Sequence, residues 1–314
     1  MKKLLFILSM SLFLTACGTE EAKKEQPTNE SGQASDYPLT VTDASGKEVT
    51  IEEEPETIVS LIPSNTEIAY SLGLGDKIIG VSDYDNYPEE VTTKEKIGGL
   101  ELNVELIVSL DPDLVLAHES SLNTSHSSLE QIEAAGIDVV VVDDAQSFDA
   151  VYDSIMFVGE VTNKTKEAQA VVDGMKGKLV SIQETVKPYN KDVSVYVEVS
   201  PPPSLYTVGK NTFMEEALSF IGATNIIEEE GWIPVDGEAV VIKNPDVIVT
   251  TYGYYTENVV EEIKKRSGWQ DVTAVAKGQI YDVNSDLVSR AGPRLVEGVE
   301  ELAKAIYPEA FTNK

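Results

Sequence analysis

Two apolar patterns alternate along most of the chain. Short runs of aliphatic and β-branched residues, typical of buried strands, are followed by segments with apolar residues at helical spacing. The strand-like runs lie at residues 57–62, 77–81, 113–117, 138–142, 194–199, 246–250 and 280–283. The helix-like segments lie at residues 65–72, 103–110, 129–135, 212–220, 236–242 and 293–306. This alternation predicts an α/β protein with mainly parallel sheets covered by helices.

The alternation stops in the middle of the chain, where apolar residues recur only at helical spacing. We predict a long helix at residues 149–187, which Thr162-Asn163 could interrupt. It separates an N-terminal α/β lobe, residues 38–148, from a C-terminal α/β lobe, residues 188–314. A helical link resists bending, so only modest closure of the two lobes is expected.

The two predicted lobes share sequence spacings. Glu105 and Glu238 each lie seven residues before a proline, and each follows a helix-capping residue by two positions. The segments from Glu67 to Gly73 and from Glu216 to Gly222 are also of equal length. All βα units resemble one another to some degree, but two coincident spacings in the same order favour a duplicated lobe. A ligand is then expected in the cleft between the lobes, at strand ends.

The N-terminus has the features of a targeting segment. A positive start and a short apolar run predict a signal peptide at residues 1–16, and the run is too short to span a bilayer. An ordinary secretory signal cut after Ala16 would leave a free thiol. However, the segment Leu14-Thr-Ala-Cys17 resembles the lipobox of bacterial lipoproteins, which implies that Cys17 is acylated. Residues 17–37 are strongly polar and predict a flexible tether at the extracytoplasmic face of the cell membrane.

Charge and composition narrow the classes of function. The net charge of −30 disfavours nucleic acid and anionic membrane surfaces as partners. The chain has no phosphate loop, dinucleotide fingerprint or nucleophile elbow, and its two histidines, His118 and His126, match no common metal site. We therefore predict no catalytic residues, no metal site and no cofactor. A surface-tethered α/β enzyme stays open as an alternative.

Aromatic residues gather in the predicted loops. Tyr84, Tyr206 and Trp232 each lie after a strand or between elements, where side chains can line a cleft or pack at the edge of a core. Together they indicate a large, flat, partly apolar ligand. Arginine occurs only at positions 266, 290 and 294, which disfavours a strongly anionic ferric siderophore.

From about Thr40 to Pro308 the chain resembles the substrate-binding proteins of ABC importers for cobalamin, iron siderophores and haem, the class with a long interlobe helix. The segment Ile58-Val-Ser-Leu-Ile-Pro-Ser-Asn-Thr-Glu67 and the two segments around Glu105 and Glu238 carry the resemblance. It implies a receptor that docks onto the permease subunits through these two glutamates, one in each lobe. We expect a monomer.

Within this family the chain is most similar to cobalamin-binding proteins. The matching positions are Tyr84 in a Ser-x-Tyr-x-x-Tyr-Pro loop, Tyr206 after a Pro-Pro turn, Trp232 six residues before Glu238, and Asp286 and Arg290 before a Pro-Arg pair. The likeness implies a corrinoid ligand, with Asp286 and Arg290 bound to its amides. At Ile97-Gly-Gly99 the chain instead resembles siderophore binders, so a ferric siderophore or haem is the alternative ligand.

Overall fold

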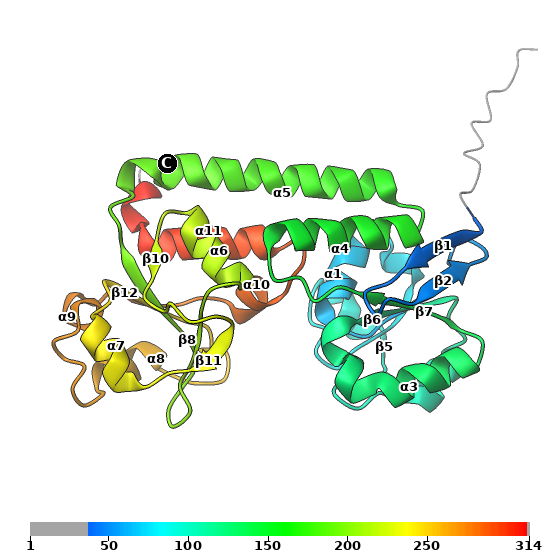
Figure 1. Cartoon of the computed structure of the whole chain (residues 1–314), viewed down its shortest axis with the longest axis horizontal. Coiled ribbons are helices and arrows are strands. Elements are labelled where there is room, and N and C mark those ends of the chain that lie inside the picture. The colour runs from blue at the N-terminus through cyan, green and yellow to red at the C-terminus, as the bar shows by residue number, and fades with distance from the viewer. Residues whose placement is uncertain (1–36, 313–314) are drawn as a thin grey trace, which may run out of the picture. The chain divides into compact units, whose positions relative to one another are not determined.

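Two mainly parallel β-sheets organise residues 37–312, the part of the chain that the computed structural model describes (Figure 1). The first lobe has the strand order β5-β4-β3-β6-β7, with every neighbouring pair parallel. Its strands are β3 (Ile58–Ser60), β4 (Ile78–Val81), β5 (Glu95–Lys96), β6 (Leu114–His118) and β7 (Asp138–Val142). Strands β3 and β6 are buried along their whole length, as expected for strands covered on both faces.

Three α-helices and a hairpin complete the first lobe. The helices are α1 (Pro63–Ser71), α2 (Val104–Leu110) and α3 (Leu122–Ala134). The antiparallel strands β1 (Leu39–Thr42) and β2 (Glu48–Ile51) were not expected from the sequence. Asp43, in the turn between them, fastens the hairpin to β7, because its Oδ2 accepts a hydrogen bond of 3.1 Å from the Val141 N–H.

The second lobe repeats the core of the first. Its parallel strands follow the order β10-β8-β12-β13, which matches the order β4-β3-β6-β7 of the first lobe. They are β8 (Ser194–Ser200), β10 (Thr224–Asn225), β12 (Val247–Thr250) and β13 (Ile280–Asp282). The α/β class and the two-lobe architecture predicted from the alternating pattern are confirmed.

Other elements distinguish the second lobe. Strand β9 (Tyr206–Val208) pairs antiparallel with β8, and β11 (Trp232–Pro234) pairs antiparallel with β9. Its helices are α6 (Phe213–Phe220), α7 (Gly237–Lys243), α8 (Val259–Lys264), α9 (Thr273–Lys277), α10 (Ser285–Ser289) and α11 (Leu295–Ile306). The predicted helix at residues 293–306 is therefore shorter than expected and follows a separate short helix.

The predicted interlobe helix is two helices, α4 (Phe148–Val161) and α5 (Thr165–Val186). The break falls at the expected position, because Asn163 adopts a left-handed conformation with a φ of 57°. Helix α5 then lies alongside α4 and extends over both lobes (Figure 1). A Cβ atom at Gly159 would lie 2.5 Å from Ala168 Cβ, so the glycine permits this close approach.

One apolar core connects the lobes, which belong to the same compact unit of the chain. Buried residues of α4, α5 and α11, such as Val151, Val172 and Val299, belong to this core together with strand residues of both sheets. Within residues 37–312, no helix combines the length and the apolar character that crossing a bilayer requires. The predicted signal peptide, Cys17 and most of the tether lie outside the described residues.

Candidate functional site

A cleft of about 650 Å³ lies between the two lobes. The first lobe contributes Tyr84 and Asn86, from the loop that follows β4. Most of the lining comes from the second lobe, chiefly from the carboxyl ends of its parallel strands and the segments that follow them, together with Met214 of α6 and Trp232 of β11. It comprises Val199, Met214, Trp232, Thr251, Tyr254, Tyr255, Asp282, Val283, Asn284, Ser285, Asp286, Ser289 and Arg290. This is the position at which open α/β sheets bind ligands.

Exposed aromatic rings form much of the cleft wall. Tyr84 is 55% exposed and Trp232 is 40% exposed, and the two come from different lobes. Trp232 is supported by Phe213, with ring centroids 6.0 Å apart. Tyr254 and Tyr255 make an edge contact with centroids 4.7 Å apart. Large apolar rings exposed inside a cleft are suited to contact with a flat ligand.

A buried polar network supports the tyrosine part of this wall. The Glu198 carboxylate accepts two hydrogen bonds of 2.6 Å from the Arg266 guanidinium and one from the Tyr252 hydroxyl. The Tyr252 ring packs against Tyr255, with centroids 6.0 Å apart. Burial, and then the negative charge of Glu198, raises the pKa of Tyr252, so this hydroxyl stays a proton donor. Arg266, one of three arginines in the chain, therefore lies in the interior of the second lobe.

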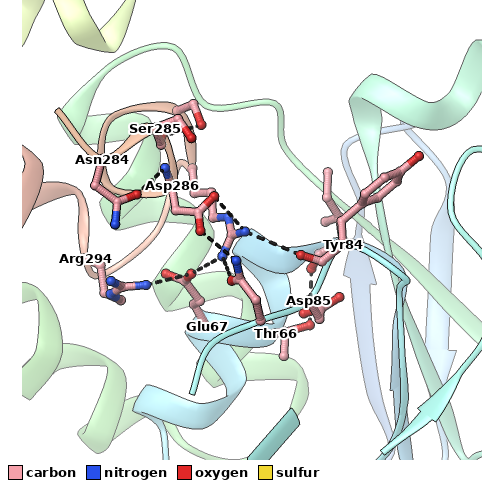
Figure 2. Close-up of polar contacts among 12 residues, drawn as sticks. Thr66, Glu67, Tyr84, Asp85, Asn284, Ser285, Asp286 and Arg294 are labelled. Carbon is pink, nitrogen blue, oxygen red and sulfur yellow. Dashed lines mark hydrogen bonds and ion pairs between the residues drawn. The ribbon is translucent and has the colours of Figure 1, made fainter. Parts of the chain in front are cut away.

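The loop that carries Tyr84 is anchored by polar contacts beneath it. Ser82 Oγ donates to Asp85 Oδ2 at 2.6 Å, and the Lys96 ammonium donates to the Asp85 carbonyl oxygen at 2.9 Å. Burial raises the pKa of the Asp85 carboxyl. Figure 2 shows Asp85 below the loop and the Tyr84 ring pointing away from the charged groups around Glu67.

The predicted pair Asp286 and Arg290 lies in the cleft wall, but it also bridges the lobes. Arg290 Nη1 donates to Glu67 Oε1 at 2.8 Å and to Asn86 Oδ1 at 2.9 Å, and both acceptors belong to the first lobe. Arg290 Nη2 lies 2.9 Å from Asp286 Oδ1. Asn86 Nδ2 in turn donates to Asp286 Oδ2 at 2.8 Å. These four side chains are thus connected by hydrogen bonds and ion pairs across the interlobe boundary.

A second arginine completes this interlobe cluster. Arg294 Nη1 lies 3.3 Å from Glu67 Oε1, and its guanidinium lies over the Tyr87 ring, 3.7 Å from the centroid. The side chains of Glu67, Asp286 and Arg294 point toward one another in Figure 2. Burial raises the pKa of Glu67, while the two arginines act in the opposite direction. Neither Glu67 nor Asn86 had been assigned a role from the sequence. Glu67 had been noted only because it lies six residues before Gly73, as Glu216 does before Gly222.

The other predicted site residues lie away from the cleft. Tyr206 is 42% exposed and is not among the residues that line the cleft. It lies on β9, which pairs with β8 and β11. Glu105 and Glu238 are exposed in the first turns of α2 and α7. Asn103 and Asp236 cap these helices by accepting hydrogen bonds from backbone N–H groups.

Candidate metal ligands are numerous but not clustered in the part of the chain that the structure describes. No group of three or more histidine, cysteine, aspartate and glutamate side chains there is arranged to hold an ion. His118 lies at the end of β6, where its Nδ1 lies 2.8 Å from Ser120 Oγ, and burial lowers its pKa. These contacts are typical of a histidine within a folded core.

Comparison with known proteins agrees with the geometry. Residues 58–287 match the family model described as periplasmic binding protein, and the chain belongs to this family. It is a substrate-binding component of an ABC transporter. It is 48% identical over 308 residues to the uncharacterized ABC transporter substrate-binding lipoprotein YvrC of Bacillus subtilis (strain 168), covering 97% of this chain and 96% of the relative.

Two further similarities differ in the ligand that they name. A cobalamin-binding protein of Halobacterium salinarum (strain ATCC 29341 / DSM 671 / R1) is 28% identical over 314 residues, covering 96% of this chain and 84% of the relative. The crystal structure of a possible iron-binding, periplasmic solute-binding protein from Staphylococcus epidermidis ATCC 12228 is 40% identical, with a TM-score of 0.76. It covers 81% of this chain and 100% of the other.

Proposed function

We propose that this protein is the extracytoplasmic receptor of an ABC importer for a corrinoid, with cobalamin as the ligand. The observation that carries the proposal is the lining of the interlobe cleft, which combines exposed aromatic rings with hydrogen-bonding groups and offers no unpaired cation among the described residues. A corrinoid is a flat macrocycle surrounded by uncharged amides. The cleft volume of about 650 Å³ is within the usual range of ligand pockets, about 300–1,000 Å³.

The charge of the cleft supports a neutral ligand over an anionic one. Among the described residues that line it, Arg290 is the cationic side chain, and its charge is matched by Glu67 and Asp286. Asp282 adds a further carboxylate, which accepts a hydrogen bond of 2.6 Å from Thr250. An anionic ligand such as haem or a catecholate siderophore would enter a site without a free positive partner.

A ferric siderophore is the second candidate ligand. The similarity to the possible iron-binding protein of Staphylococcus epidermidis, at 40% identity, favours it. The glycine pair at Gly98 and Gly99 is the sequence feature that also favours a ferric siderophore. Of the two, Gly99 borders the proposed site, because a Cβ atom there would lie 3.0 Å from the Tyr84 ring.

Calorimetric titration of the purified protein with cobalamin, cobinamide, haem and a ferric hydroxamate tests the proposal. We expect saturable binding of cobalamin and cobinamide and weaker or absent binding of haem. A change in the optical absorption of cobalamin on mixing provides an independent readout. Heat from the ferric hydroxamate with none from either corrinoid would replace the corrinoid assignment by the siderophore one. Chemical turnover of a bound ligand would instead favour a surface-tethered enzyme.

Delivery requires attachment to the membrane and docking onto the permease. We propose that Cys17 is acylated and holds the receptor at the extracytoplasmic face of the cell membrane, in agreement with the name of the Bacillus subtilis relative. Replacing Cys17→Ser should release the protein into the medium, as measured by fractionation. A variant that still partitions with membranes and leaves them only in detergent would contradict the anchor. Glu105 and Glu238 are the proposed docking residues, one in each lobe.

A further inference from the structure

Arg290, a second-lobe residue in the cleft lining, connects Glu67 of the first lobe to the cleft. Its side chain is 12% exposed and belongs to the cleft lining, whereas Glu67, its strongest partner in the first lobe, does not. The guanidinium is held from two sides, by Glu67 and Asn86 of the first lobe and by Asp286 of the second. A change at Glu67 can therefore reach a bound ligand only through another side chain.

Glu67 has few ways to satisfy its charge. Its side chain is 2% exposed, and Oε1 contacts both Arg290 and Arg294. Its second oxygen, Oε2, has no hydrogen-bond partner among the described residues. Removing a partner from a buried carboxylate is costly, because the charge left behind is not solvated. The carboxylate therefore favours the orientation of Arg290 in which Nη1 stays at Glu67 and Nη2 faces Asp286.

The second lobe contains a natural comparison. Glu216 occupies the position in α6 that Glu67 occupies in α1, since each lies six residues before a glycine with a φ of 76°. Glu216 Oε2 accepts a hydrogen bond of 2.8 Å from the Phe148 N–H, at the start of α4. Each glutamate thus contacts the segment that follows the last strand of the other lobe. Only Glu67 does so through an arginine that lines the cleft.

We propose that Glu67 is a positioning residue for ligand binding, which fixes the Arg290 guanidinium beside Asp286 in the orientation that the ligand meets. Glu67 does not touch the ligand. It shares with Glu216 the task of joining the lobes, and it adds a task that Glu216 lacks. This inference rests on the proposed function, because it takes Arg290 as a ligand-binding residue and cobalamin as the first probe.

A double-mutant cycle tests whether Glu67 acts through Arg290. Cobalamin affinity is measured by calorimetry for the wild type, Glu67→Gln, Arg290→Ala and the double variant. We expect Glu67→Gln to weaken binding about tenfold in the wild-type background and less than twofold in the Arg290→Ala background. Equal losses in the two backgrounds, or no loss from Glu67→Gln, would overturn the proposal.

Two further variants separate positioning from stability. Glu216→Gln makes the matching change in the second lobe, because it replaces the charged acceptor of the Phe148 N–H by a neutral one. We expect it to lower the melting temperature while leaving affinity within twofold of the wild type. Glu67→Asp keeps the charge but withdraws it by one methylene, and we expect it to bind cobalamin between the wild type and Glu67→Gln. Glu67→Asp can also replace Glu67→Gln in the double-mutant cycle if Glu67→Gln does not fold. An affinity loss in Glu216→Gln equal to that in Glu67→Gln would reduce both residues to a structural role.

The failure of the two proposals can be told apart. If the wild type binds no cobalamin, the corrinoid assignment is wrong, and the same proteins are titrated with haem and a ferric hydroxamate. Glu67→Gln should then weaken the probe that binds, again only when Arg290 is present. Unchanged affinity for that probe would overturn the role of Glu67 independently of the identity of the ligand.

Discussion

The two lobes share a scaffold but contribute unequally to the lining of the cleft. In both lobes, a helix ends at a left-handed residue followed by Pro-Asp, with a φ of 49° at Asp111 and 48° at Asn244. In both, the aspartate that follows the proline accepts hydrogen bonds from the residue at the start of the first parallel strand. Asp113 binds the N–H and hydroxyl of Thr57, and Asp246 binds those of Ser194. The repeated helix ends and aspartate hydrogen bonds thus stabilise the connection between helix and strand in each lobe.

Two of the predicted site residues in the cleft lining belong to elements that the second lobe adds. Trp232 belongs to β11, an antiparallel strand that the first lobe lacks, and Asp286 belongs to the short helix α10. The first lobe contributes the loop of Tyr84 and Asn86. A duplicated scaffold can therefore keep Glu105 and Glu238 at matching positions, each in the first turn of a helix, while the cleft linings of the two lobes diverge.

The largest effect should come from changing the two proposed docking glutamates, one in each lobe, at the same time. We expect Glu105→Gln combined with Glu238→Gln to reduce uptake of labelled cobalamin to near background, with each single variant intermediate. Stability and cobalamin affinity should stay near normal, because both side chains are exposed. Uptake by cells with equal receptor levels is the measurement. Transport at the wild-type rate would leave only a stabilising effect on the helix dipoles, about 0.3–1 kcal/mol each.

The next largest effect should come from Trp232, the aromatic residue on the strand that only the second lobe has. Trp232→Ala should weaken cobalamin binding at least about tenfold, since truncating a central aromatic in a site costs about 2 kcal/mol or more. Trp232→Phe keeps a ring and should lose less. Tyr206→Ala, on the neighbouring strand but outside the cleft lining, should lose less than Trp232→Ala. Circular dichroism checks the fold, and wild-type affinity in Trp232→Ala would remove Trp232 from the site.

A smaller effect should come from the paired aspartates at the strand starts. We expect Asp113→Asn and Asp246→Asn each to lower the free energy of unfolding by about 1 kcal/mol, the usual net value of such hydrogen bonds. Asp113 should cost more, because its Oδ2 also accepts a hydrogen bond of 2.9 Å from the Glu56 N–H. Urea denaturation measures both. A change in cobalamin affinity in either variant would contradict their assignment to the scaffold alone.

The smallest effect is the pH dependence of the Asp113 contribution. Burial acts to raise the pKa of Asp113, but hydrogen bonds from Glu56 and Thr57 outweigh it, and the pKa lies below its ordinary value of 3.8. A carboxylate with a lowered pKa stabilises the fold above the unfolded-state pKa and loses this as pH falls through the folded-state pKa. The stability gap between the wild type and Asp113→Asn should thus be constant above about pH 5 and shrink below pH 3.8. A gap that widens with acid would contradict this sign.

The sequence predicted the parts of the fold that have a strong local signal. The β-branched run at residues 138–142 is strand β7, and Asn103 and Asp236 cap helices as expected. The hairpin β1–β2 and strands β9 and β11 were missed, because each contains exposed residues and none is the fully buried apolar run that β3 and β12 belong to. Their pairing depends on partners far along the chain. Asn163 shows the same limit, since a residue that can break a helix does so only where packing favours the turn.

The candidate site was predicted to a similar extent. Tyr84, Trp232, Asp286 and Arg290 all lie in the cleft lining, and their roles in binding remain predictions. Glu67 could not be assigned, because a helix with buried residues on several sides does not show which of them faces the other lobe. Its contacts with Arg290 and Arg294 span more than 200 positions in the sequence, and only the assembled fold brings these residues together.

The apolar core shared by α4, α5 and α11 contains side chains of both lobes. We therefore expect residues 37–312 to unfold as a single cooperative unit, with neither lobe melting while the other stays intact. A chain divided between α4 and α5 would expose apolar surface on both pieces and favour their reassociation. We therefore expect the described part of the receptor to unfold under heat or a pulling force in one cooperative step, although its cleft lies between two lobes.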